Sequence, residues 1–187
     1  MSEQVIKIAD TTGNPGALGL TGFSLATLML SFHNMGIFSD SLPVIAMAIF
    51  VGGLAQLLAG MLAWKKGNTF ETVAFTGFGV FWLSFAYILI APFGAAAASD
   101  LSLGLYLILW GVLGVGLLLG TLKMGVKALI VVFVLLVLTF FVTAASHLVA
   151  ISALGFLAGF CAFLLGAAAF YTAMAIVLNE LGYKLPM

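Results

Sequence analysis

The sequence contains no arginine and few charged residues of any kind. Its six lysines and six acidic residues amount to 6% of 187 positions, where a soluble domain carries about 25%. Hydrophobic residues make up 64%. A water-soluble fold of this length needs more polar surface than twelve ionisable side chains supply, so the composition excludes that class. A lipid environment accounts for the missing polar surface.

Other shortages narrow the function. Basic clusters are missing and the formal net charge is zero, which argues against a nucleic-acid partner. Cys161 is the only cysteine, so no disulfide forms within the chain. Neither an HExxH nor a GxSxG element is present, and the two histidines lie far apart in the sequence. We therefore expect neither enzymatic activity nor a cofactor or metal.

Long apolar stretches predict an all-α integral membrane protein. Residues 128–178 contain no charge, and as one helix they would extend about 75 Å, far beyond a bilayer core of about 30 Å. This stretch must therefore fold back, at a turn marked by Ser146, His147 and Ser152. The sequence predicts six spans, near residues 16–35, 42–64, 72–91, 101–122, 128–146 and 152–178.

The lysines predict the orientation of these spans. In the six-span arrangement every lysine falls on one side: Lys7, Lys65, Lys66, Lys123, Lys127 and Lys184. The opposite loops carry Asp40, Asp100 and His147. Because cytoplasmic loops are enriched in lysine and arginine, we expect the lysine side to face the cytoplasm. Residues 1–13 and 181–187 then form cytoplasmic tails of one domain, 14–180, in the plasma (inner) membrane.

No charged residue lies inside a predicted span, so neutral polar side chains are the functional candidates. Gln56 lies deep in the second span, with Gly52 and Gly60 four residues to either side on the same helix face. The glycines either leave room for a small solute or accompany an interhelical hydrogen bond. A hydroxyl stripe in the first span either lines a pathway or bonds back to its own helix: Thr21, Ser24, Thr27 and Ser31.

Two pairs of glycines allow close helix approach. They are Gly116 with Gly120, and Gly155 with Gly159. The sequence leaves open whether these pairs pack within one subunit or between subunits.

The first span opens with the motif NPGALGL at residues 14–20. Asn14 is a suitable helix cap, and Pro15 suits the first helical position, where its missing N–H costs nothing. The motif is either a plain helix start or a positive helix end that attracts an anion at the mouth of a pathway.

This motif resembles the N-terminal signature N-P-(A or G)-P-L-G-L of the acetate uptake transporter family, the succinate–acetate permeases. Ala17 stands where the second proline is usual. The resemblance continues in order along the chain, through FHNMG (32–36), GGLAQLLAG (52–60), KGNTF (66–70), AFTGFGVFW (74–82), WG (110–111), GTLK (120–123) and VLNE (177–180).

The resemblance implies a homohexamer of six-span subunits, each with its own pathway for acetate and, in some members, succinate or other small carboxylates. Members act as proton symporters or as anion channels. The family's constriction falls on Phe23, Phe78 and Leu135, with Phe78 replacing the usual tyrosine. The family's glutamine matches Gln56. Further substrate-binding candidates are Thr27, Asn34 and Trp82, and the entrance motif comprises Asn14, Pro15, Leu18 and Gly19.

Two kinds of transported molecule are compatible with spans that carry no charge. A bare acetate anion pays a large desolvation cost at an apolar constriction and the protonated acid pays far less, which favours uptake of acetate together with a proton. A channel for small neutral amides such as urea, built on a similar hexameric plan, is the alternative. The motifs at Asn14-Pro15 and His33-Asn34 favour the carboxylate.

Overall fold

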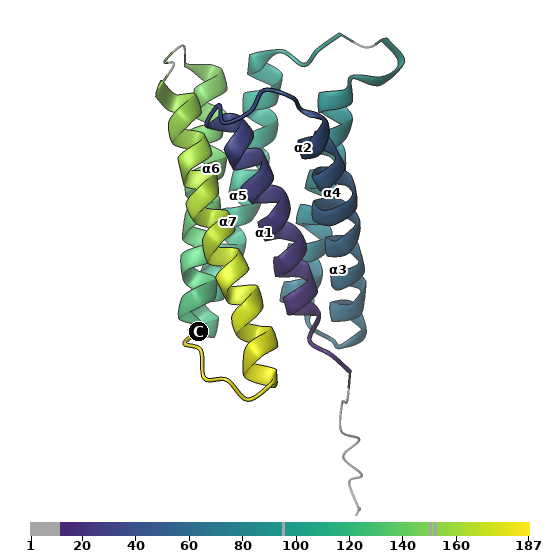
Figure 1. Cartoon of the computed structure of the whole chain (residues 1–187), viewed down its shortest axis with the longest axis vertical. Helices are drawn as coiled ribbons and strands as arrows, with labels where there is room; N and C mark the ends of the chain where they lie inside the picture. The colour runs from purple at the N-terminus through teal and green to yellow at the C-terminus, as the bar shows by residue number, and fades with distance from the viewer. Residues whose placement is uncertain (1–11, 95, 150, 152) are drawn as a thin grey trace, which may run out of the picture.

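A computed structural model describes residues 12–94, 96–149, 151 and 153–187. Figure 1 shows long helices running side by side between two ends of an elongated bundle. The elements follow one another as α1 (Pro15–Asn34), α2 (Leu42–Ala46), the π-helix η1 (Met47–Ala55), α3 (Gln56–Lys65), α4 (Thr69–Ile90), the 3₁₀ turn η2 (Pro92–Gly94), α5 (Asp100–Met124), α6 (Lys127–Leu148) and α7 (Ala153–Glu180).

Within the described residues, six helical stretches are long and apolar enough to cross a membrane. This confirms the predicted fold class. The second stretch, Leu42–Lys65, joins α2, η1 and α3 into one span of 24 residues. The predicted break after the fifth span is present, because α6 ends at Leu148 and α7 begins at Ala153. Ser152 itself lies outside the described residues.

Local sequence chemistry sets the helix ends. The Asn14 side chain accepts a hydrogen bond from the Gly16 N–H at 2.9 Å, and Pro15 is the first helical residue, as predicted. Asn68 caps α4 in the same way, accepting from the Glu71 N–H at 3.0 Å. Gly125 ends α5 at a φ of 73°, a left-handed conformation that suits glycine.

The two ends of the bundle differ in their charged residues. One end, called here the lysine end, carries the described lysines, which are Lys65, Lys66, Lys123, Lys127 and Lys184. The other, called here the histidine end, carries His33, Asp100 and His147. Helix α1 begins at the lysine end, where the C-terminus also lies (Figure 1). Lys7 falls outside the described residues.

The helices close into a ring around one core. Helix α7 packs between α1 and α6, and α5 packs on the far side of α6. Helix α4 packs on α3 and η1, which in turn contact α1. The buried core draws side chains from every span, so its centre lies on the axis of the ring.

In each of the two glycine pairs, one glycine packs closely within the subunit and the other does not. A Cβ at Gly120 would lie 3.0 Å from the Phe70 ring, and one at Gly159 would lie 2.9 Å from the Met35 backbone nitrogen. These two glycines therefore serve packing within the subunit. Their partners Gly116 and Gly155 have no such neighbour within 4 Å among the described residues, so both lie open to lipid or to another subunit.

Candidate functional site

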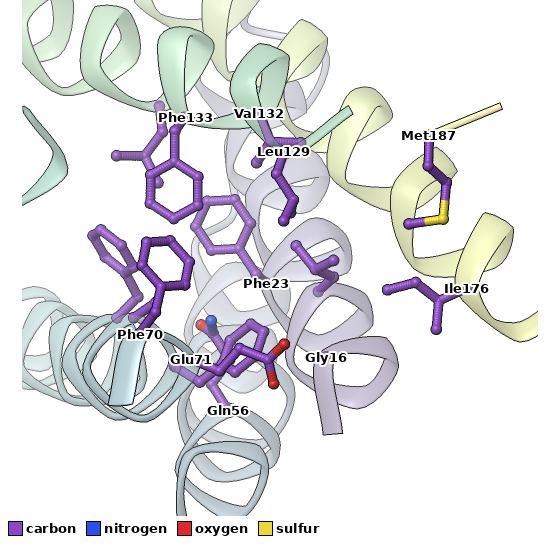
Figure 2. A pocket seen from close by; sticks show the side chains of 15 residues that line it. Gly16, Phe23, Gln56, Phe70, Glu71, Leu129, Val132, Phe133, Ile176 and Met187 are labelled. Atoms are coloured by element: carbon purple, nitrogen blue, oxygen red, sulfur yellow. The ribbon is translucent and has the colours of Figure 1, made fainter. Parts of the chain in front are cut away.

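Two cavities open along the axis of the bundle from opposite ends. The lysine-end cavity has a volume of about 60 Å³ and is lined mainly by apolar side chains together with Gln56 and Glu71 (Figure 2). The histidine-end cavity has a volume of about 200 Å³ and reaches His33 and His147. Phe23 lines both cavities. The two spaces therefore approach each other at this ring.

An apolar layer separates the cavities. The Phe78 ring lies 6.1 Å from Phe23 and 5.9 Å from Phe140, measured between ring centroids, and it stacks on Phe140. Leu136 lines the lysine-end cavity beside them, and all four side chains are buried. A small solute moving between the two cavities has to displace this layer.

The structure corrects one predicted member of the constriction. Leu135 lines neither cavity and packs, partly buried, against the outside of the core. Leu136 faces the lysine-end cavity in its place. Successive residues of an α-helix point about 100° apart, so an error of one residue moves the side chain off the axis. Phe23 and Phe78 both line the lysine-end cavity.

Gln56 lies at the boundary between η1 and α3 and is 1% exposed. It lines the lysine-end cavity, and its Oε1 has no hydrogen-bond partner among the described residues. A π-helix is rare, and such irregularities often mark functional sites. The side chain thus lines the cavity and keeps a buried acceptor without a partner.

The glycines that flank Gln56 do not make room for a solute. A Cβ at Gly52 would lie 2.6 Å from the Trp82 ring, and one at Gly60 would overlap Thr76. Both glycines allow α4 to approach the second span closely. The solute-space interpretation of these glycines is therefore wrong, although Gln56 itself faces a cavity.

Trp82 supplies a hydrogen-bond donor on the histidine side of the apolar layer. It is 2% exposed and lines the histidine-end cavity, and its indole N–H has no acceptor among the described residues. A buried donor or acceptor without a partner costs about 1–3 kcal/mol. One unused acceptor and one unused donor therefore flank the apolar layer.

The hydroxyl stripe of α1 bonds back to its own helix. Thr27 donates to the Phe23 carbonyl at 2.7 Å, and the other three hydroxyls make equivalent bonds of 2.7–2.9 Å. Thr27 still lines the histidine-end cavity, as does Asn34. Since its proton is already engaged, the Thr27 oxygen can only accept a further hydrogen bond.

The entrance motif has mainly a structural role. Asn14 and Pro15 start the helix, and a Cβ at Gly19 would overlap the Phe75 ring. Leu18 is 40% exposed. None of these four residues lines the lysine-end cavity, which the motif reaches through Gly16 and Leu20.

Glu71, which was expected to precede the third span, lies in the first turn of α4. Helix α4 begins at Thr69, three residues before the predicted start, and its first turn places the half-buried Glu71 side chain on the wall of the lysine-end cavity. Its Oε1 lies 3.4 Å from the position that a Cβ on Gly16 would take. The sequence held a signal for this earlier start, because Asn68 followed three residues later by Glu71 matches a helix-capping pattern.

At the histidine end, His147 Nδ1 lies 3.0 Å from Asp100 Oδ1 and joins α6 to α5. This contact is exposed, and His147 also lines the rim of the histidine-end cavity. In the part of the chain that the structure describes, no three His, Cys, Asp or Glu side chains gather into a possible metal site.

Comparisons with known proteins find transporters and a channel that are similar to this chain. The succinate-acetate/proton symporter SatP of Escherichia coli K12 is 44% identical over 169 residues, which cover 89% of each chain. A solved structure described as the bacterial acetate channel SatP superposes with a TM-score of 0.91 at 42% identity, covering 95% of this chain and 99% of that one. Acetate permease A of Emericella nidulans is 49% identical over 78 residues, 41% of this chain and 26% of its own.

These relatives are transporters or channels, in line with the expectation that the chain is not an enzyme. The resemblance noted in the sequence is confirmed by a family match that spans residues 4–183. The chain belongs to the GPR1/FUN34/yaaH family.

Proposed function

We propose that this protein carries acetate and related small carboxylates across a membrane, each together with a proton. The observation that carries the proposal is the layer of Phe23, Phe78 and Leu136 between two cavities on the axis of a six-span bundle. The names of the SatP and acetate permease relatives support the choice of cargo.

The apolar layer favours passage of the neutral acid. An ionised carboxylate crossing it would lose its hydration without gaining a cation, whereas the protonated acid crosses at much lower cost. Narrow apolar constrictions also exclude water when no solute is present. Uptake of the acid is then electroneutral, since the proton travels on the cargo.

The two unpartnered polar atoms complement the two oxygens of a protonated carboxylic acid group. The Trp82 N–H can donate to the carbonyl oxygen of the cargo, while Gln56 Oε1 can accept from the hydroxyl of the protonated form. An ionised carboxylate has no hydrogen to offer to Gln56. This difference supports the protonated form as the species that leaves the constriction on the lysine side.

A channel for urea is the weaker alternative. Urea also offers hydrogen-bond donors and an acceptor, so the two polar atoms alone do not exclude it. The names of the relatives, however, mention acetate and succinate, which favours a carboxylate as the transported molecule.

We also propose that the lysine end faces the cytoplasm, so that both tails lie there, and that six copies assemble in the plasma (inner) membrane. The positive-inside rule supports the orientation. The resemblance to the acetate transporters supports the hexamer, and the open faces at Gly116 and Gly155 are compatible with it.

Uptake into proteoliposomes tests the proposed cargo. We expect labelled acetate to enter faster than into protein-free vesicles when the outside is acidic, because each acetate carries a proton inward. Labelled urea should enter at the protein-free rate. Urea uptake without acetate uptake would support the amide channel instead.

Cysteine labelling tests the orientation. After the buried native thiol is removed by Cys161→Ala, cysteines at Asp40 and Asp100 should react with an impermeant reagent added to intact cells. Cysteines at Lys65 and Lys123 should react only after the membrane is opened. All four positions are exposed within one subunit, so labelling of all four in intact cells would contradict the topology.

A further inference from the structure

Glu71 is a carboxylate inside the proposed pathway, and the proposed function assigns it no role. Among the described residues that line the lysine-end cavity, it is the one side chain with an ionisable group. The remaining walls are apolar apart from Gln56. An ionisable residue within a membrane span is costly to keep and is therefore a functional candidate.

Helix capping does not account for this side chain. A glutamate three residues after the cap commonly reaches back to the N–H of the capping residue. Here the Asn68 N–H already donates to the Ala63 carbonyl at 3.0 Å. The cap of α4 is completed by the Asn68 side chain and the Glu71 N–H, and the Glu71 carboxylate, which the Asn68 side chain also hydrogen-bonds, lies on the wall of the cavity.

The carboxylate lies where a cargo carboxylate would also be held. Figure 2 shows it turned toward Gly16, in the first turn of α1. The positive end of a helix attracts anions. Gln56, buried and with its Oε1 unpartnered, marks the same cavity as a binding site for a group that donates a hydrogen bond.

Few other charges act on Glu71. The ammonium of Lys66 is the cation that acts on its carboxylate, and the side-chain amide of Asn68 donates a hydrogen bond to it. From α1, Gly16 faces it and carries no charge. The other titratable side chains of this end lie outside the cavity lining and are Lys65, Lys123, Lys127, Tyr171, Glu180, Tyr183 and Lys184.

A cavity of about 60 Å³ holds the volume of only a few water molecules. Two ionised carboxylates cannot share such a space, because like charges at short range disfavour each other, and the pair keeps one proton. The two carboxylates share the retained proton, and either of them can carry it.

On the basis of the proposed function, we propose that Glu71 is the proton-exchange site of the pathway, which shares one proton with the cargo carboxylate in the lysine-end cavity. During uptake, the O–H bond of the arriving acid breaks and an O–H bond forms on Glu71. The cargo anion then leaves toward the lysines, and Glu71 releases the proton to water. In the opposite direction, a water-derived proton on Glu71 passes to the entering anion, which crosses as the neutral acid.

The pH profile of acetate exchange tests this role. Labelled acetate exchange should be measured in proteoliposomes at equal pH on both sides, from pH 6 to pH 8, after subtraction of the protein-free rate. Without an exchange site, the rate follows the neutral acid in solution, which decreases tenfold per pH unit. We expect Glu71→Gln to match the wild type within about twofold at pH 6 and to be about tenfold slower at pH 8.

Two further variants complete the experiment. Glu71→Asp keeps a carboxylate at this position and should retain most of the wild-type profile. Glu180→Gln removes a carboxylate that is exposed at the same end but does not line the cavity, and it should leave the profile unchanged. Glutamine is also accepted three residues after a helix cap, so Glu71→Gln preserves the start of α4.

The outcomes separate the two proposals. If the wild type exchanges no acetate above the protein-free rate, the proposed function is wrong. If the wild type exchanges acetate and Glu71→Gln slows it equally at every pH, the role of Glu71 is structural and the inference is overturned. Faster exchange by Glu71→Gln at pH 8 also overturns it, since Glu71 would then only repel the anion.

Discussion

Leu136→Ala is expected to admit lactate through a pathway that otherwise favours acetate. The truncation removes three carbon atoms from the layer formed with Phe23 and Phe78. A difference of one methylene in an apolar pocket changes discrimination by about 10–200-fold. We therefore expect the ratio of lactate to acetate uptake to rise by about tenfold or more, measured in proteoliposomes and normalised to folded protein.

The neighbouring leucine provides the control. Leu135→Ala removes the same atoms from the same helix, but this side chain lines neither cavity. Leucine truncation in a core costs about 2–5 kcal/mol of stability, so both variants can lose folded protein. Only Leu136→Ala should change selectivity, and an equal change in both would place the constriction elsewhere.

The two rings of the layer offer a second comparison. Phe23→Ala should also raise the lactate ratio, because this ring lines both cavities. Phe78→Tyr should act differently, since it adds a hydroxyl at a side chain that is 2% exposed and surrounded by aromatic rings. A hydroxyl donor there would offer the cargo a hydrogen bond at the narrowest point without widening it.

The spans were predictable from the sequence because lipid imposes a strong and simple pattern. A charge-free run of 51 residues, 128–178, has to turn once in a bilayer, and the turn was found between Leu148 and Ala153. The number of spans, six, also places every lysine on the same side of the membrane. These predictions depend on length and composition, which do not require knowledge of packing.

The site was less predictable, because it depends on which way each side chain points. Leu135 and Leu136 have the same hydropathy, and only the rotation of α6 decides which one faces the axis. Space for a solute was one of two interpretations of Gly52 and Gly60, and α4 fills that space. Glu71 was missed because the start of α4 was placed by hydropathy, which ignores the Asn68 cap.

Gln56→Leu is expected to separate transport from stability. Leucine keeps roughly the volume of glutamine but removes the unpartnered Oε1, whose burial costs about 1–3 kcal/mol. Thermal unfolding should therefore show equal or higher stability. Acetate uptake should fall by about tenfold, which corresponds to the loss of one hydrogen bond of about 1.4 kcal/mol to the cargo.

Thr121→Val is the matched control for Gln56→Leu. Thr121 is equally buried, but it lies on α5, lines neither cavity and donates to the Leu118 carbonyl. Its replacement removes a buried polar group away from the axis, so acetate uptake should stay near the wild-type rate. Trp82→Phe, which removes the unpartnered N–H on the other side of the layer, should instead lower uptake as Gln56→Leu does. If Gln56→Leu keeps full transport while its stability decreases, the amide holds the bundle together and does not contact the cargo.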